Sequence, residues 1–109
     1  MDIEQLRLYA LSKPGSEESF PFGESTLVFK VKGRMFLLLS LDAVPVQFNA
    51  KADPEEALEL REQYACILPG YHMNKKHWNT VIVDGTLTSK QIQQLIDTSY
   101  ALVNGRKKK

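Results

Sequence analysis

Cysteine and long hydrophobic runs are almost absent from this 109-residue sequence. Cys66 is the only cysteine, so no intramolecular disulfide can form, which is typical of a reducing compartment. Because the residues beside it are apolar, we expect Cys66 to lie in the core as a small hydrophobic side chain. No segment approaches the roughly 20 apolar residues of a membrane-spanning helix, and the start lacks the basic segment and cleavage site of a secretory signal. We therefore expect a cytoplasmic protein with no membrane contact.

Motifs of catalysis and cofactor binding are also missing. No G-x-S-x-G motif is present, and the glycines of KPGS and PFGES stand singly, without the spacing of a phosphate-binding loop. His72 and His77 have two lysines between them and one cysteine upstream. Zinc sites use paired ligands at short spacing, and nearby positive charge opposes a dication. The sequence therefore predicts no enzyme, no metal site and no cofactor.

Positive charge is scarce outside the C-terminus. The net charge of +1 includes four basic residues at 106–109, and the other 10 basic residues face 13 acidic ones, which leaves −3 for residues 1–105. Such a body cannot hold nucleic acid by bulk attraction, so any such binding needs the tail or a local patch. One patch exists, because Pro69 to Val83 contains Lys75 and Lys76 and no acid.

The sequence contains no internal repeats and no flexible linkers, which predicts a single domain over residues 1–105 followed by the basic tail at 106–109. Three helices are expected, at about residues 2–12, 54–64 and 88–103. Each begins with an oxygen-bearing side chain, at Asp2, Asp53 and Thr88, and has Glu or Gln three residues later. In the second helix we expect burial of Ala57, Leu58, the Arg61 stem and Tyr64.

Strand-like runs occur at residues 25–32, 34–41, 44–50, 66–68 and 77–83. The second run is apolar on both faces and should be central, whereas Pro45 predicts an edge or a strand start for the third. The order α-β-β-β-α-β-β-α predicts an α+β fold, a two-layer sandwich with an antiparallel sheet of about five strands and helices on one face.

The stretch LPGYHMNKKHWNTV, residues 68–81, concentrates the polar and aromatic groups of the chain. Lysines can contact phosphates, asparagines can bond to phosphates or bases, and Tyr71 or the histidines can stack on them. Polar, basic hairpin loops are common, however, and Trp78 is expected to be a core anchor facing the same layer as Ile82. From these residues alone, nucleic acid and a protein or ligand contact both stay open.

Four blocks of the sequence together resemble the MmcQ/YjbR family of small bacterial proteins. They are KPGSEESFPFGESTLVFKVKGRMFLLLS, ADPEEALELREQY, PGYHMNKKHWNTVIVDGTL and IDTSYALV. The resemblance covers Ile3 to Val103, and the PGYHMNKKHWNTV block is its most distinctive part. It implies an α-β(3)-α-β(2)-α two-layer domain with a double-wing arrangement, similar in architecture to secretion chaperones.

For function, the resemblance implies DNA binding without an enzymatic activity or cofactor. Carried to this sequence, the nucleic-acid-binding positions are Tyr71, His72, Asn74, Lys75, Lys76, His77, Trp78 and Asn79, with Lys13 as a further candidate. The main alternative is a protein-interaction module, which predicts an exposed apolar patch. A third is small-molecule binding between sheet and helices, which requires a concave pocket. We expect a monomer.

Overall fold

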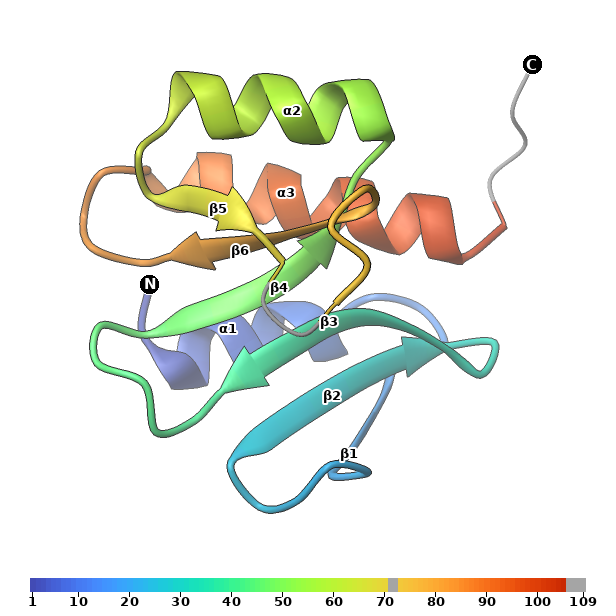
Figure 1. Ribbon diagram of the computed structural model, residues 1–109. Helices are drawn as coiled ribbons and strands as arrows, with labels where there is room; N and C mark the ends of the chain where they lie inside the picture. Colours follow the sequence, from blue (N-terminus) through green and yellow to red (C-terminus); the bar gives the residue numbers. More distant parts are fainter. Residues whose placement is uncertain (71–72, 106–109) are drawn as a thin grey trace.

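The computed structural model describes residues 1–70 and 73–105 (Figure 1). Nine elements follow one another along the chain: α1 (Ile3–Leu11), β1 (Glu17–Ser19), β2 (Thr26–Val31), β3 (Arg34–Ser40), β4 (Gln47–Lys51), α2 (Pro54–Gln63), β5 (Ile67–Pro69), β6 (Trp78–Ile82) and α3 (Ser89–Val103). The predicted α+β class is confirmed. None of the helices in these residues is long and apolar enough to cross a membrane.

The sheet has the order β1-β2-β3-β4-β6-β5, and every neighbouring pair is antiparallel. It contains six strands where about five were expected. The additional strand, β1, has the sequence EES, which shows no apolar alternation that could reveal it. Its partner β2 and the Arg7 guanidinium of α1, 2.8 and 2.6 Å from the Glu18 carboxylate oxygens, hold it in place.

The strand positions follow from the sequence pattern. β3 lies inside the sheet, and its four consecutive residues Phe36–Leu39 are all buried, as the run that is apolar on both faces predicted. β4 also lies inside the sheet, and it begins at Gln47, after Pro45. Because proline cannot donate a ladder hydrogen bond, the strand starts only beyond it.

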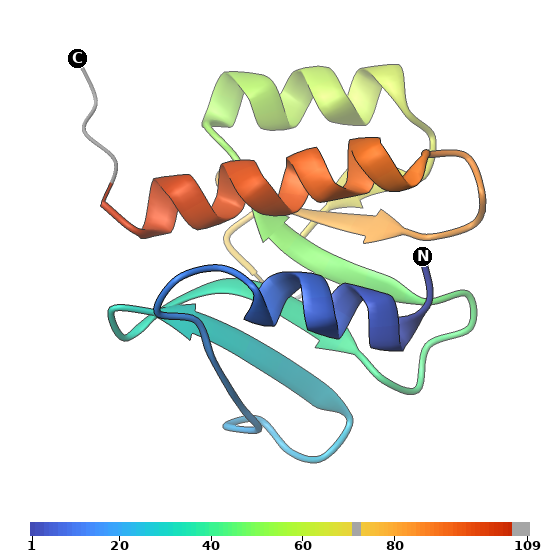
Figure 2. The same ribbon diagram turned by 180° about the vertical axis from the view of Figure 1, so that it is seen from behind.

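The helices cover one face of the sheet: α1 and α3 lie behind it in Figure 1 and in front of it in Figure 2, which shows the opposite side. The capping boxes predicted at Asp2 and Thr88 are formed. In α2, Ala57 is buried as expected, but Leu58 is 55% exposed and the prediction of its burial was wrong. The helix instead turns Leu60 towards the core.

One buried serine ties α3 to the middle of the sheet. The Ser99 hydroxyl donates to the Phe36 carbonyl at 2.5 Å and accepts from the Lys51 backbone N–H at 2.8 Å. Ser99 has no exposed surface, so its hydroxyl supplies the hydrogen-bond partner of one backbone group in β3 and one in β4 where water cannot. The bond fixes where α3 lies relative to β3 and β4.

The opposite face of the sheet carries a second, smaller cluster. Val28, Leu38 and Trp78 are buried there, with Met35 and Met73 packed against them. Trp78 is thus an anchor, but not in the expected layer, because Ile82 packs against the main core. Val28 and Leu38 are paired across β2 and β3 on this face, and the chain after Gly70 brings Met73 and Trp78 onto them.

Candidate nucleic-acid interface

The residues that sequence analysis singled out lie mainly in the connection between β5 and β6. We call residues 73–77 the basic loop. The Asn74 carbonyl accepts hydrogen bonds from the backbone N–H groups of His77 at 3.2 Å and Trp78 at 3.0 Å, which closes the turn. The Asn74 side-chain oxygen accepts from the Lys76 N–H at 2.9 Å. Asn74 therefore shapes the loop from within, with its side-chain oxygen already engaged.

The loop is closed at its base by Gly70, whose N–H donates to the Trp78 carbonyl at 2.9 Å. A Cβ at this glycine would lie 2.8 Å from the Trp78 Cβ and 2.9 Å from the Trp78 oxygen. Real Cβ atoms do not come so close to other atoms. Glycine is needed here so that the two strands of the hairpin can meet.

Arg61 of α2 anchors the loop, a role that sequence analysis did not assign to it. Its Nε donates to the Asn79 side-chain oxygen at 2.8 Å, and a terminal guanidinium nitrogen donates to the Lys75 carbonyl at 2.5 Å. The sequence offered only the position of Arg61 on the inner side of α2, where burial of its stem was expected. The guanidinium fork joins the helix, β6 and the loop in one contact.

Asn79, one of the predicted contacts to nucleic acid, lies on the helix side of β6. Its side chain is 3% exposed, accepts from Arg61 and donates to the Ala57 carbonyl at 3.3 Å. A buried amide with these partners has a structural role. Strand alternation explains this placement, because Asn79 and Val81 face the helices while Trp78 and Thr80 face the second cluster.

The two lysines of the basic loop point their charges to solvent. Lys75 and Lys76 are exposed, and His77 is half-buried. Within residues 1–70 and 73–105, the ion pairs that form involve Arg7 and Lys13. The ammonium groups at 75 and 76 are therefore not neutralised by any described carboxylate. Lys51 stands opposite Trp78 in the β4–β6 pairing, which adds a cation beside the base of the loop.

The sequence has relatives among known proteins. A family model described as YjbR matches residues 11–102. The chain belongs to the YjbR family. It is 41% identical over 101 residues to protein YbdF of Escherichia coli O157:H7, covering 92% of this chain and 82% of that one. It is 36% identical over 100 residues to protein YjbR of Escherichia coli strain K12, covering 92% and 85%.

Solved structures show the same fold. A crystal structure of the Deinococcus radiodurans protein DR2400 superposes with a TM-score of 0.90 at 42% identity, covering 95% of this chain and 79% of that one. A crystal structure of a Pseudomonas syringae protein gives a TM-score of 0.81 at 29% identity, with coverage of 94% and 99%. Membership of the YjbR family thus establishes ancestry and fold.

The remaining predicted positions of this YjbR-family chain are not joined to the loop. Lys13 follows α1 on the helical face, where its ammonium pairs with Asp97 of α3 and lies 4.7 Å from the centre of the Tyr9 ring. Burial opposes the charged form, but hydrogen bonds to Asp97 and Tyr9 outweigh it and raise the pKa of Lys13. Tyr71 and His72 lie outside the described residues.

Candidate metal ligands and the single thiol of this family member can be placed within the described residues. Among those residues, no three His, Cys, Asp or Glu side chains gather as a metal site would require. Cys66 is buried in the core, as predicted, and burial followed by the nearby Asp84 charge raises the pKa of its thiol. A buried thiol with a raised pKa is inert, because the thiolate is the reactive form.

Proposed function

We propose that this protein binds the phosphate backbone of DNA through the basic loop, as a binding protein without catalysis. The single observation that carries the proposal is the pair of exposed ammonium groups, Lys75 and Lys76, on a loop held by Arg61 and Trp78. A loop fixed in this way loses little conformational freedom on binding. The proposal includes a cytoplasmic location, which is supported by the single free thiol.

The predicted mode of binding is electrostatic and weak. Lys75, Lys76 and Lys51 would supply three phosphate contacts, which corresponds to a slope of about −2.7 for the logarithm of affinity against the logarithm of salt concentration. In a double-wing arrangement, the β2–β3 hairpin would contact the same duplex through Arg34, which is exposed at the start of β3, whereas the Lys32 ammonium donates to the Asn104 carbonyl at 3.1 Å. His77 and Asn74 lie beside the lysines and would position the backbone rather than read bases.

The test is a salt-dependent titration of a short duplex and a single strand by fluorescence anisotropy. Lys75→Ala and Lys76→Ala should each weaken binding to every sequence and lower the salt slope by about 1. Lys90→Ala removes one exposed charge from α3 and is the matched control. Because residues 106–109 are also basic, each variant is measured with and without them.

Two results would overturn the proposal. One is the absence of binding to either nucleic acid at about 50 mM salt, where phosphate contacts are strongest within the usual range. The other is a Lys75→Ala/Lys76→Ala variant that binds as tightly as Lys90→Ala. If removing residues 106–109 abolishes binding by the Lys75→Ala/Lys76→Ala variant and by Lys90→Ala alike, the tail and not the loop contacts the DNA.

A protein partner is the second candidate, and one observation favours it. Phe20 and Phe22, in the connection between β1 and β2, are 51% and 63% exposed. Exposed aromatic side chains are frequent at protein interfaces. A photo-crosslinking residue placed at position 22 should then yield a discrete crosslinked protein in cells, whereas the same residue at position 76 should not. The reverse pattern would exclude this surface.

A further inference from the structure

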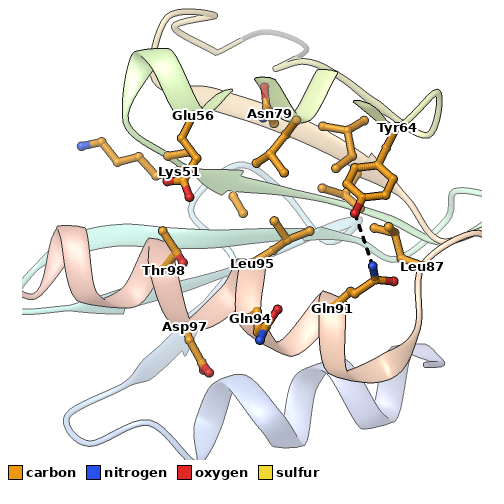
Figure 3. A pocket seen from close by; sticks show the side chains of 15 residues that line it. Lys51, Glu56, Tyr64, Asn79, Leu87, Gln91, Gln94, Leu95, Asp97 and Thr98 are labelled. Atoms are coloured by element: carbon orange, nitrogen blue, oxygen red, sulfur yellow. Dashed lines mark hydrogen bonds between the residues drawn. The ribbon is translucent and has the colours of Figure 1, made fainter. Parts of the chain in front are cut away.

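A groove separates α2 from α3 on the helical side of the sheet, away from the second cluster (Figure 3). Its volume is about 430 Å³. Cavities of about 300–1,000 Å³ are typical of small-molecule sites. The floor is apolar and is formed by the sheet, with Ala50, Ile67 and Val81 among its residues.

The groove exists because the residues at its floor and at one end are arranged to keep it open. Ala50 and Ala52 are buried at 5% exposure each, and their methyl groups fill little of the space below the helices. Tyr64, after the last turn of α2, accepts a hydrogen bond from the Gln91 amide at 3.3 Å. This contact spans the groove at one end, as the dashed line in Figure 3 shows.

The two walls differ in chemistry. The α2 side contributes Leu60 and the Tyr64 ring. On the α3 side, Leu95 and Thr98 point into the groove, and Gln94 lies at its outer rim, on the same side of α3 as Asp97 (Figure 3). Within the described chain, the side chains of Gln94 and Thr98 form no hydrogen bond with protein groups. They are therefore available to a ligand at the α3 edge of the groove, which faces the apolar floor.

The charges around the groove cancel. Lys51 and Glu56 lie at the end opposite Tyr64 and carry opposite charges (Figure 3). Asp97 also lines the groove, but its carboxylate is paired with Lys13 and accepts from the Tyr9 hydroxyl at 2.6 Å. A ligand with a net charge would gain no complementary field here, whereas an uncharged one loses little solvation on entering.

We propose that this groove binds an uncharged small molecule whose apolar body lies on the Ala50–Val81 floor and whose hydrogen-bonding edge faces Thr98 and the rim at Gln94. The inference does not rest on DNA binding: Lys75 and Lys76 lie outside the groove, and Lys51, at its end, is the one residue that the two proposals share. The hydrogen bond between Gln91 and Tyr64 bridges the groove at one end, so a continuous helix could not pass along it.

The probe for this site is indole-3-acetamide, which has an uncharged aromatic body and an amide. Titrated into the whole ¹⁵N-labelled protein, it should shift the backbone amide resonances of residues 50–52 and of Leu95 and Thr98. For a molecule of this size, a dissociation constant of about 1 mM is expected. Resonances of Val28, Leu38 and Trp78, on the other face of the sheet, should not move.

Two variants and a matched control locate the site. Gln94→Trp and Thr98→Phe place bulk over the groove from exposed or half-exposed positions and should each weaken binding about tenfold or more, the equivalent of one lost aromatic contact. Gln93→Trp makes the same change one residue earlier, on a part of α3 that does not line the groove, and should bind as the unsubstituted protein does. Dispersed amide spectra establish that each variant is folded.

The charge of the ligand is tested with indole-3-acetate, which has the same ring and a carboxylate. We expect it to bind no more tightly than the amide. Tighter binding of the acid by about tenfold would overturn the uncharged class. Absence of shifts with indole-3-acetamide up to about 10 mM, ten times the expected constant, would overturn the site. So would shifts that persist unchanged in both Gln94→Trp and Thr98→Phe.

Discussion

Replacing Arg61 by methionine should detach the basic loop from α2 and destabilise the whole domain. The substitution keeps the apolar stem and removes the two guanidinium bonds, to Asn79 and to the Lys75 carbonyl. Water can replace the second, because Lys75 is exposed. Loss of the first bond leaves the side-chain oxygen of Asn79, a residue that is 3% exposed, without its donor. For a hydrogen bond to a charged group, this lowers the free energy of unfolding by about 1.5–3 kcal/mol.

The free energy of unfolding should therefore fall by about 2 kcal/mol, and the melting temperature by about 10 °C for a domain of this size. Urea denaturation measures the loss, and an unchanged slope would show that the change lies in the folded state. Arg34→Met is the matched control, since Arg34 is exposed at the start of β3 and its loss should cost less than about 0.5 kcal/mol.

The reasoning also predicts a coupling. In a double-mutant cycle, Asn79→Ala should cost about 1 kcal/mol less in the Arg61→Met background than alone, because the two side chains share one hydrogen bond. The interpretation of Arg61 as the anchor would be refuted by an Arg61→Met variant as stable as Arg34→Met. Strict additivity of Arg61→Met and Asn79→Ala would refute it equally.

Three further predictions follow from buried contacts. Gly70→Ala should destabilise by about 1–3 kcal/mol, because its Cβ would meet Trp78; a urea midpoint equal to that of the unsubstituted protein would contradict the close approach. Ser99→Ala should cost about 2–4 kcal/mol by leaving the Lys51 N–H and the Phe36 carbonyl unpaired, against little change for exposed Ser89→Ala in the same thermal melts. Burial raises the pKa of Cys66, so the unfolded chain ionises first and stability should fall as pH rises above the ordinary thiol value of about 8.5, a decline that Cys66→Ala should lack.

The fold was largely predictable because local signals agreed with it. The capping residues Asp2 and Thr88, the 3.6-residue spacing of Ile92, Ile96, Ser99 and Val103, and the apolar run of β3 each indicated the observed element. Strand β1 was not predictable, since a three-residue polar strand owes its place to β2 and Arg7. The layer of Trp78 was mispredicted because strict alternation places Trp78 and Ile82 on one face, whereas Ile82, the last residue of β6, packs against the main core.

The sequence by itself determined the family, the α+β class, the buried cysteine and the concentration of basic residues between Pro69 and Val83, since these depend on residue types and on spacing along the chain. Only the tertiary structure decided which of those residues are available. In the folded protein, Asn79 is buried beneath α2 and bonded to Arg61, and the side-chain oxygen of Asn74 accepts a hydrogen bond within the loop. Lys13 is paired with Asp97, whereas Lys75 and Lys76 are exposed to solvent. The tertiary structure also opened the groove between α2 and α3. Such features join residues far apart in the chain, and no local pattern encodes them.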